Sequence, residues 1–201
     1  GEPKIRWQFA EFSDIGGSHK FNSANCDLRS MADQIKIYVQ PGGNAYSQQR
    51  RLSSKGKDNI NSLLDEGKTL YVGTCAGWFY AVGAYFWQGE RYDHRHLLGR
   101  FPATVEGSLT TIADFDADPG YATTLMDDGR PAVYYGGPTI GWRDTAAASM
   151  PADAQVLESF AGPGDVAGLP AVIKWKNMLL YSVHLEAQEG VGLSALALTE
   201  A

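Results

Sequence analysis

The sequence predicts an α/β protein with a mainly parallel central sheet and antiparallel additions in the C-terminal half. Two observations indicate this class. Residues 35–73 read as strand, helix and strand, a length that suits a parallel pair joined by a right-handed crossover. The second half holds short β-rich runs, and residues 173–182 resemble a hairpin that turns at Lys176-Asn177.

The first half of the chain alternates strand and helix signals. Residues 35–39 are rich in β-formers and stop at the sharp turn Pro41-Gly42-Gly43. Ser54 can cap a helix over about residues 55–66, and Gly67 can end it. The other elements expected here are a strand at 4–9, a short helix at 25–33, a strand at 69–73 and a buried helix at 76–86.

The second half is expected to supply mostly strands. The β-rich runs lie at residues 103–105, 109–112, 132–135, 155–160, 171–176 and 178–184, and a helix near 192–198 closes the chain. The sequence shows no internal repeat and no low-complexity linker. A single domain over residues 1–201 is therefore predicted.

Composition narrows the classes of partner. Hydrophobic residues make up 44% and charged residues 20%, as in soluble globular proteins, and no apolar run is long enough to span a membrane. A net charge of −6 argues against a nucleic-acid partner. The opening Gly-Glu-Pro-Lys does not resemble a secretory signal. The compartment stays open: cytoplasmic, or periplasmic or secreted if an export signal was removed.

One of the two cysteines stands in an unusual place. In the stretch Y-V-G-T-C-A-G, Cys75 follows a strand and is flanked by Gly73 and Gly77. Strand, G-x-C-x-G and helix form a nucleophile elbow, in which the helix N-terminus favours the thiolate. A buried structural cysteine, or a disulfide with Cys26, would also fit this local pattern.

A cysteine nucleophile needs a base and a group that orients the base. His184 ends an apolar strand, and Glu186 follows two residues later, on the same side of an extended chain. Both Cys75 and His184 fall where strands of an open parallel sheet would end, which is where such sheets place their sites. A strand-end histidine beside a surface glutamate is the simpler alternative.

The motifs together resemble a known family. The segments Y-V-Q-P-G-G-N-A, G-T-C-A-G-W-F-Y-A, Y-Y-G-G-P and H-L-E, in this order, are similar to those of the class I glutamine amidotransferase-like superfamily. Within it, they most resemble the group related to the N-terminal domain of biotin–protein ligases. The resemblance spans about residues 35–187 and implies a flavodoxin-like three-layer sandwich with a Cys-His-Glu triad.

The resemblance also implies roles for individual residues. Cys75 would be the nucleophile, His184 the base and Glu186 its orienting partner, while the backbone amides of Gly43 and Ala76 would form the oxyanion hole. The residues that would shape the substrate site are Gly42, Asn44, Trp78, Gly136 and Gly137. No cofactor is expected.

The substrate does not follow from the resemblance. Glutamine-hydrolysing members usually carry Gln shortly after the cysteine motif, where this chain has Trp78-Phe79-Tyr80. Related proteases and chaperones place His directly after the cysteine, where this chain has Ala76. A cysteine-dependent amide hydrolase or amidotransferase-like enzyme, acting on a small-molecule or peptide-like amide, is the first hypothesis. A non-catalytic binding or regulatory module of the same fold is the alternative.

Two further clusters contain residue types that bind metals. Asp114, Asp116 and Asp118 have the spacing of a calcium loop, but that loop would need Gly at Pro119 and Glu at Leu125. His94 and His96 lack further zinc ligands nearby in the sequence. No metal is predicted, and the acidic segment is expected to be a solvated turn.

Overall fold

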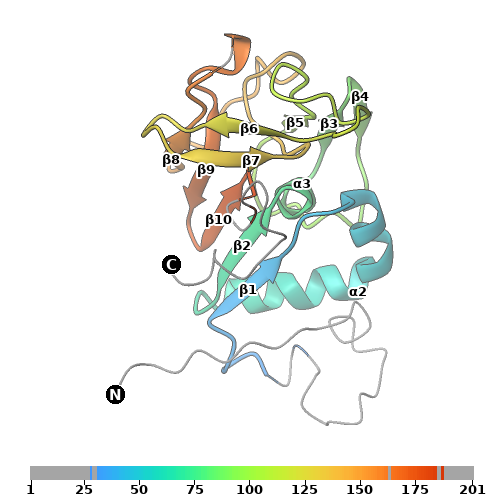
Figure 1. Cartoon of the computed structure of the whole chain (residues 1–201). Helices are drawn as coiled ribbons and strands as arrows, with labels where there is room; N and C mark the ends of the chain where they lie inside the picture. The colour runs from blue at the N-terminus through green and yellow to red at the C-terminus, as the bar shows by residue number, and fades with distance from the viewer. Residues whose placement is uncertain (1–27, 29–30, 163, 185–186, 188–201) are drawn as a thin grey trace.

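A five-stranded mixed sheet organises the chain in a computed structural model that describes Leu28 and residues 31–162, 164–184 and 187 (Figure 1). Its order is β1-β2-β10-β9-β8. The strands are β1 (Ile37–Gln40), β2 (Leu70–Thr74), β8 (Gln155–Ser159), β9 (Pro170–Trp175) and β10 (Met178–Tyr181). Pairing is parallel across β1-β2-β10 and antiparallel across β10-β9-β8. The antiparallel additions were predicted correctly, but parallel pairing covers only half of this sheet.

The long helix α2 (Ala45–Asp65) connects β1 to β2. The prediction placed its start near residue 55, with Ser54 as the cap; this is wrong. Asn44 is extended and its Oδ1 accepts the Ser47 N–H at 2.8 Å, so the helix is capped a full ten residues earlier. The predicted end holds, because Gly67 takes a positive φ of 71° and its N–H reaches the Leu64 carbonyl at 3.1 Å.

The short helix α3 (Ala76–Ala81) is wholly buried, and it ends earlier than the predicted helix at 76–86. Val82 is extended, with φ −88° and ψ 170°, and β3 (Tyr85–Trp87) follows. The reason is that a run that is apolar on every side suits a buried helix and a buried strand equally. Pairing of β3 with its neighbours decides the matter in favour of a strand.

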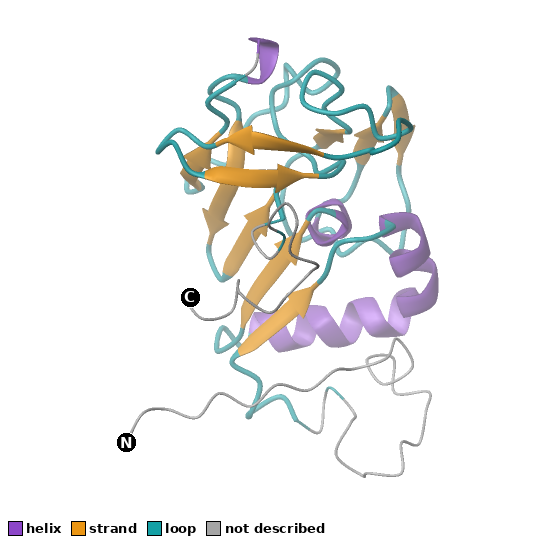
Figure 2. Cartoon of the chain, viewed as in Figure 1, coloured by secondary structure: helices purple, strands orange, loops and turns teal. Residues whose placement is uncertain are grey.

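Two small sheets cover one end of the main sheet (Figure 2). One has the order β4-β3-β5, with β4 (Glu90–Tyr92) and β5 (Val105–Gly107), and the other is the hairpin β6 (Ala122–Leu125) and β7 (Pro131–Tyr134). A 3-10 turn, η1 (Gly164–Val166), lies between β8 and β9. Strands β3, β4 and β6 were not predicted. The strand predicted at 109–112 is a turn instead, closed by the Ile112 N–H on the Leu109 carbonyl at 2.9 Å.

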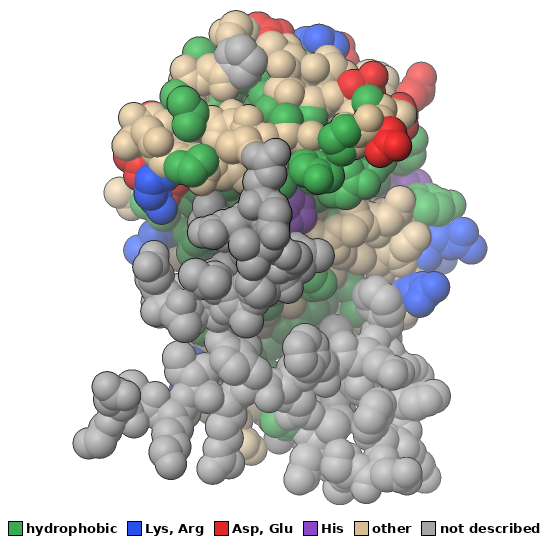
Figure 3. Space-filling model, viewed as in Figure 1, with side chains coloured by type: hydrophobic (Ala, Val, Ile, Leu, Met, Phe, Trp, Pro, Cys, Tyr) green, Lys and Arg blue, Asp and Glu red, His purple; other side chains and the backbone are tan. Residues whose placement is uncertain are grey.

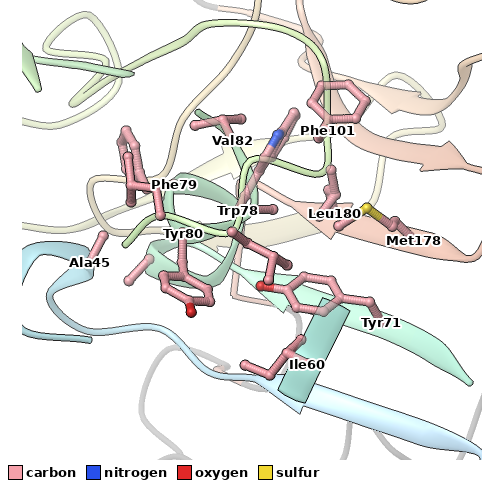
Figure 4. Close-up of a cluster of buried hydrophobic side chains, with 14 of the residues drawn as sticks. Ala45, Ile60, Tyr71, Trp78, Phe79, Tyr80, Val82, Phe101, Met178 and Leu180 are labelled. Carbon is pink, nitrogen blue, oxygen red and sulfur yellow. The ribbon is translucent and has the colours of Figure 1, made fainter. Parts of the chain in front are cut away.

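One of two buried hydrophobic clusters among the described residues lies between the main sheet and its two helices, which contact each other (Figure 4). The second cluster includes Tyr134 of β7 and Val172 of β9. Tyr71 of β2 and Met178 and Leu180 of β10 are fully buried beneath α2 and α3. Val39, on the opposite face of β1, is 38% exposed. The described residues therefore form one helical layer on one face of the sheet. None of their helices is long and apolar enough to cross a membrane.

Several predicted elements lie outside the described residues. These are the strand at 4–9, the helix at 192–198 and most of the helix at 25–33, of which residues 31–33 form turns. The three-layer arrangement is not seen in the described part of the chain.

Candidate active site

Cys75 occupies a sharp turn between β2 and α3. Its backbone has φ 52° and ψ −106°, a conformation that residues other than Gly rarely adopt. Its N–H donates to the Tyr181 carbonyl of β10 at 2.8 Å. The thiol is free and the residue is 6% exposed. A strained strand-to-helix turn of this kind is the backbone arrangement of a nucleophile elbow.

The two glycines that flank this turn are required by close packing. A Cβ placed on Gly77 would lie 2.1 Å from the carbonyl oxygen of Gln40, at the end of β1. A Cβ on Gly73 would lie 2.9 Å from the backbone of Gly77. The G-x-C-x-G pattern therefore lets the elbow rest directly on the neighbouring strand, in addition to allowing the bend.

Three of the predicted motifs converge at one point. A Cβ placed on Gly42 would lie 2.7 Å from Cε1 of His184 and 3.6 Å from Cβ of Cys75. His184 is 9% exposed, and its backbone N–H donates to the Val133 carbonyl of β7 at 2.8 Å. The P-G-G turn, the elbow and the late histidine are thus neighbours in space.

The topology explains this convergence. Gly42 follows β1, Cys75 follows β2, and His184 follows β10, and these three strands are adjacent and parallel (Figure 1). Carboxyl ends of parallel strands meet at one edge of a sheet, which is where open α/β sheets place their sites. Motifs that are far apart along the chain therefore become neighbours at that edge.

The remaining predicted catalytic groups are placed only in part. Glu186 lies outside the described residues. Gly43 is exposed, has φ 120° and has open space on the side where a Cβ would stand. Ala76 is the first residue of α3, beside Cys75. The roles of Gly43 and Ala76 in an oxyanion hole stay predictions.

Two residues expected to shape the substrate site serve the fold. Trp78 is fully buried and packs edge-on against Phe101, with ring centroids 6.5 Å apart, so its side chain belongs to the hydrophobic core (Figure 4). All six residues of α3 are buried, so Trp78 has no exposed side of this helix to occupy. The Asn44 side chain caps α2 through Ser47.

The Y-Y-G-G-P segment lies beside the cysteine, as the resemblance implied. The Cys75 Sγ donates to the Tyr135 carbonyl at 3.4 Å. A Cβ on Gly137 would stand 1.8 Å from the Ser182 carbonyl oxygen, so this loop packs tightly on the segment that leads to His184. Tyr134 fixes the loop because its hydroxyl donates to the Gly137 carbonyl at 2.8 Å, and burial raises its pKa well above the ordinary value.

An aromatic cluster beside this loop was not predicted. Phe115 stacks on Tyr135 with ring centroids 4.9 Å apart and an interplanar angle of 22°, and Trp87 meets Phe115 edge-on at 4.9 Å. Tyr121 also meets Tyr135, edge to face, with ring centroids 6.4 Å apart. Phe115 and Tyr121 come from the connection between β5 and β6, while Trp87 ends β3 and Tyr135 follows β7. Their sequence spacing carries no periodic signal, and only the composition of each loop could have marked them.

The acidic turn and the His94-His96 pair make contacts that involve no metal geometry. In the acidic turn, the Asp114 Oδ1 accepts the Asp116 N–H at 3.1 Å. The His94 ring lies between those of Tyr46 and Tyr92, and His96 Nε2 accepts from Arg95. Within the described ranges, no group of three His, Cys, Asp or Glu side chains could hold a metal ion.

Comparisons with known proteins support the fold. No protein-family model matches the sequence, and no curated protein matches it. Among solved structures, the chain is similar to a crystal structure of a glutamine amidotransferase, with 20% identity and a TM-score of 0.54. The similarity covers 74% of this chain and 69% of that one. The chain therefore has a mixed α/β, glutamine amidotransferase-like fold.

Proposed function

We propose that this protein is a cysteine-dependent amide hydrolase or amidotransferase-like enzyme that uses a Cys75-His184-Glu186 triad. One observation carries the proposal: the Gly42 turn, the strained Cys75 elbow and the buried His184 meet at the edge where three parallel strands end. The proposal includes one domain over residues 1–201, a three-layer flavodoxin-like sandwich, and kinship with the biotin–protein ligase N-terminal group.

The chemistry follows from these positions. The Cys75 thiolate attacks the carbonyl carbon of an amide, forming a C–S bond while the Gly43 and Ala76 amides hold the oxyanion. The C–N bond then breaks, and protonated His184 gives its proton to the leaving amine. His184 next takes a proton from water, which attacks the thioester, releases the acid and restores the thiol. Glu186 orients His184 throughout.

The substrate class is an amide other than free glutamine. The residues that follow the cysteine motif are Trp78-Phe79-Tyr80, where glutamine-hydrolysing members of the superfamily usually carry Gln. The aromatic residues beside Tyr135 present apolar surface at the site. A small or peptide-like amide with a side chain that rests on aromatic rings fits this surface better than the short, uncharged polar side chain of glutamine.

One observation favours the alternative, a non-catalytic binding or regulatory module. Cys75 is 6% exposed, and its thiol donates a hydrogen bond to the Tyr135 carbonyl at 3.4 Å, so the sulfur is packed against the protein's own backbone. A module that kept the elbow for its packing would show the same geometry.

Alkylation of Cys75 separates the two functions. The rate of reaction with iodoacetamide is followed by peptide mass spectrometry between pH 5 and 9 (roughly spanning the ionisation of His and Cys). A triad predicts a rate at pH 6 that falls by about 10-fold or more in His184→Ala, because the thiolate loses its imidazolium partner. His96→Ala, a partly exposed histidine elsewhere in the chain, is the matched control. Equal rates in wild type and His184→Ala would leave the non-catalytic module as the function.

A further inference from the structure

The aromatic cluster beside Cys75 has the properties of a binding surface. We define it as the aromatic shelf, formed by Trp87, Phe115, Tyr121 and Tyr135. We propose that the shelf binds the side chain of an arginine or lysine in a peptide substrate, next to the amide that Cys75 attacks. This inference rests on the proposed function and names its substrate class.

The shelf is continuous and is joined to the candidate nucleophile. The carbonyl of Tyr135 accepts from the Cys75 thiol at 3.4 Å, while its ring stacks on Phe115. A Cβ on Gly136 would lie 2.8 Å from Phe115 and 2.9 Å from Trp87, so glycine lets the loop lie directly against these rings. Tyr135 thus belongs to the shelf through its ring and contacts the candidate nucleophile through its backbone.

The shelf is open to solvent. Tyr135 is 43% exposed and Tyr121 is 47% exposed. Pockets for small molecules are concave and enclose most of their ligand, whereas an extended peptide is covered on one side only. Exposed aromatic side chains on an open surface thus favour a peptide. Figure 3 shows hydrophobic side chains gathered on this face between a histidine at its centre and acidic side chains at the upper right.

The segment that carries Phe115 is acidic and should attract a cation, although the Arg143 guanidinium reaches the start of this segment by donating to Thr110 Oγ1 at 3.1 Å. Residues 101–129 contain no Lys, Arg or His, and within the described ion pairs none involves Asp114, Asp116 or Asp118. All three carboxylates are exposed, and they flank Phe115 in the sequence. The Gln88 side chain, next to Trp87, donates to Asp116 Oδ2 at 2.7 Å and so ties this acidic turn to the shelf.

Aromatic faces and nearby carboxylates recognise the same ligand group. A guanidinium or ammonium group is attracted to the face of an aromatic ring, and a guanidinium also stacks on it. Carboxylates at the rim add long-range attraction for a cation and repel an anion. A basic peptide side chain satisfies both features at once, whereas a neutral apolar side chain uses only the rings.

The test measures binding without chemistry. The Cys75→Ala chain is titrated with acetyl-Gly-Arg-Gly amide and with its norleucine and glutamate analogues, using saturation-transfer NMR. We expect the arginine peptide to bind about 10-fold tighter than the norleucine peptide, and the glutamate peptide to bind weakest. The preference should shrink at about 0.5 M salt, because exposed charges are screened.

Variants connect the preference to the shelf. Phe115→Leu with Tyr135→Leu removes the two stacked rings of the shelf but keeps apolar volume, and Asp114→Asn with Asp116→Asn and Asp118→Asn removes charge. Each set should bring the arginine and norleucine affinities to within about 2-fold. Tyr46→Leu and Asp127→Asn, an exposed tyrosine and an exposed aspartate elsewhere, are the matched controls and should keep the preference. Thermal unfolding shows that each variant is folded.

Three results would overturn the inference: equal affinity for the three peptides, a preference that survives both sets of variants, or agmatine binding as tightly as the arginine peptide. The last result would mean that the shelf takes a small cation. Because these measurements need no reactive cysteine, they stand apart from the His184 alkylation test. A chain that passes one and fails the other shows which proposal is wrong.

Discussion

Replacing Gly42 by alanine tests whether His184 must keep its position beside Cys75. The added Cβ would stand 2.7 Å from His184 Cε1, and ordinary van der Waals contact begins at 3.4 Å. The imidazole or the turn must therefore move by about 0.7 Å, the difference between these two distances. Because His184 is 9% exposed and packed, it cannot absorb this shift by turning into solvent.

Gly42→Ala should mainly lower the reactivity of Cys75. A displacement approaching 1 Å in a catalytic group can cost about 100-fold, so we expect the iodoacetamide rate at Cys75 to fall by about 10- to 100-fold at pH 6. That range corresponds to about 1.4–2.7 kcal/mol of barrier. Overpacking by one methyl group should lower the free energy of unfolding by about 1–3 kcal/mol. Peptide mass spectrometry measures the first quantity, and urea denaturation measures the second.

Gly83→Ala is the control for this experiment. Gly83 is exposed, and a Cβ there meets no atom within 4 Å, so its replacement should change neither quantity appreciably. A Gly42→Ala chain that alkylates within about 2-fold of wild type would refute the reasoning. So would a Gly83→Ala chain that loses as much reactivity as Gly42→Ala.

Three further predictions address the elbow, the core and a buried carboxylate. Gly77→Ala should destabilise the fold by about 3 kcal/mol or more in urea denaturation. The reason is that its Cβ would overlap the Gln40 carbonyl oxygen at 2.1 Å, and neither backbone can yield. A stable variant would mean that the elbow is loosely packed. Trp78→Phe should leave the rate of Cys75 alkylation unchanged, and a changed rate would assign the indole to the site. Trp78→Ala should lower the free energy of unfolding by about 3–5 kcal/mol, because it opens a cavity in the core. Burial raises the pKa of Glu106 in the folded chain, and two backbone hydrogen bonds, from Asp144 and Thr145, oppose that shift. The folded state therefore holds this proton to higher pH than the unfolded state does, and wild type loses stability as pH rises through the raised pKa. The free energy of unfolding of Glu106→Gln should therefore rise relative to that of wild type between pH 4 and pH 7 (roughly the range over which Glu ionises), as measured by urea denaturation. A difference in unfolding free energy that stays constant across this range would contradict the assignment.

Much of the main sheet could be predicted because its strands carry strong local signals. The strands around Ile37, Tyr71 and Ile173 are β-rich, and the Lys176-Asn177 turn joins the last two strands as expected. Where two local signals competed, prediction failed. Asn44 and Ser54 are both good caps, and the sequence alone does not rank them; the Ser47 hydrogen bond shows which one begins the helix.

The candidate site was predictable as a set of motifs because each motif obeys a local rule. Cys75 requires glycine on both sides to bend away from its strand, and Gly42 and His184 each follow a strand. Parallel pairing then makes their convergence a consequence of topology. Local pattern and sheet topology are encoded along the chain and can be read from it.

Tertiary structure alone decided which side chains surround these motifs. Trp78 lies in the core because α3 is buried on every side and packs against distant residues such as Phe101, which no spacing in the sequence records. Phe115 reaches Tyr135 because two loops distant in sequence pack against the glycines of the Y-Y-G-G-P turn. Loops have no periodicity, and their positions follow from the packing of everything beneath them. For that reason the sequence determined where chemistry could occur, and the fold determined what surface stands beside it.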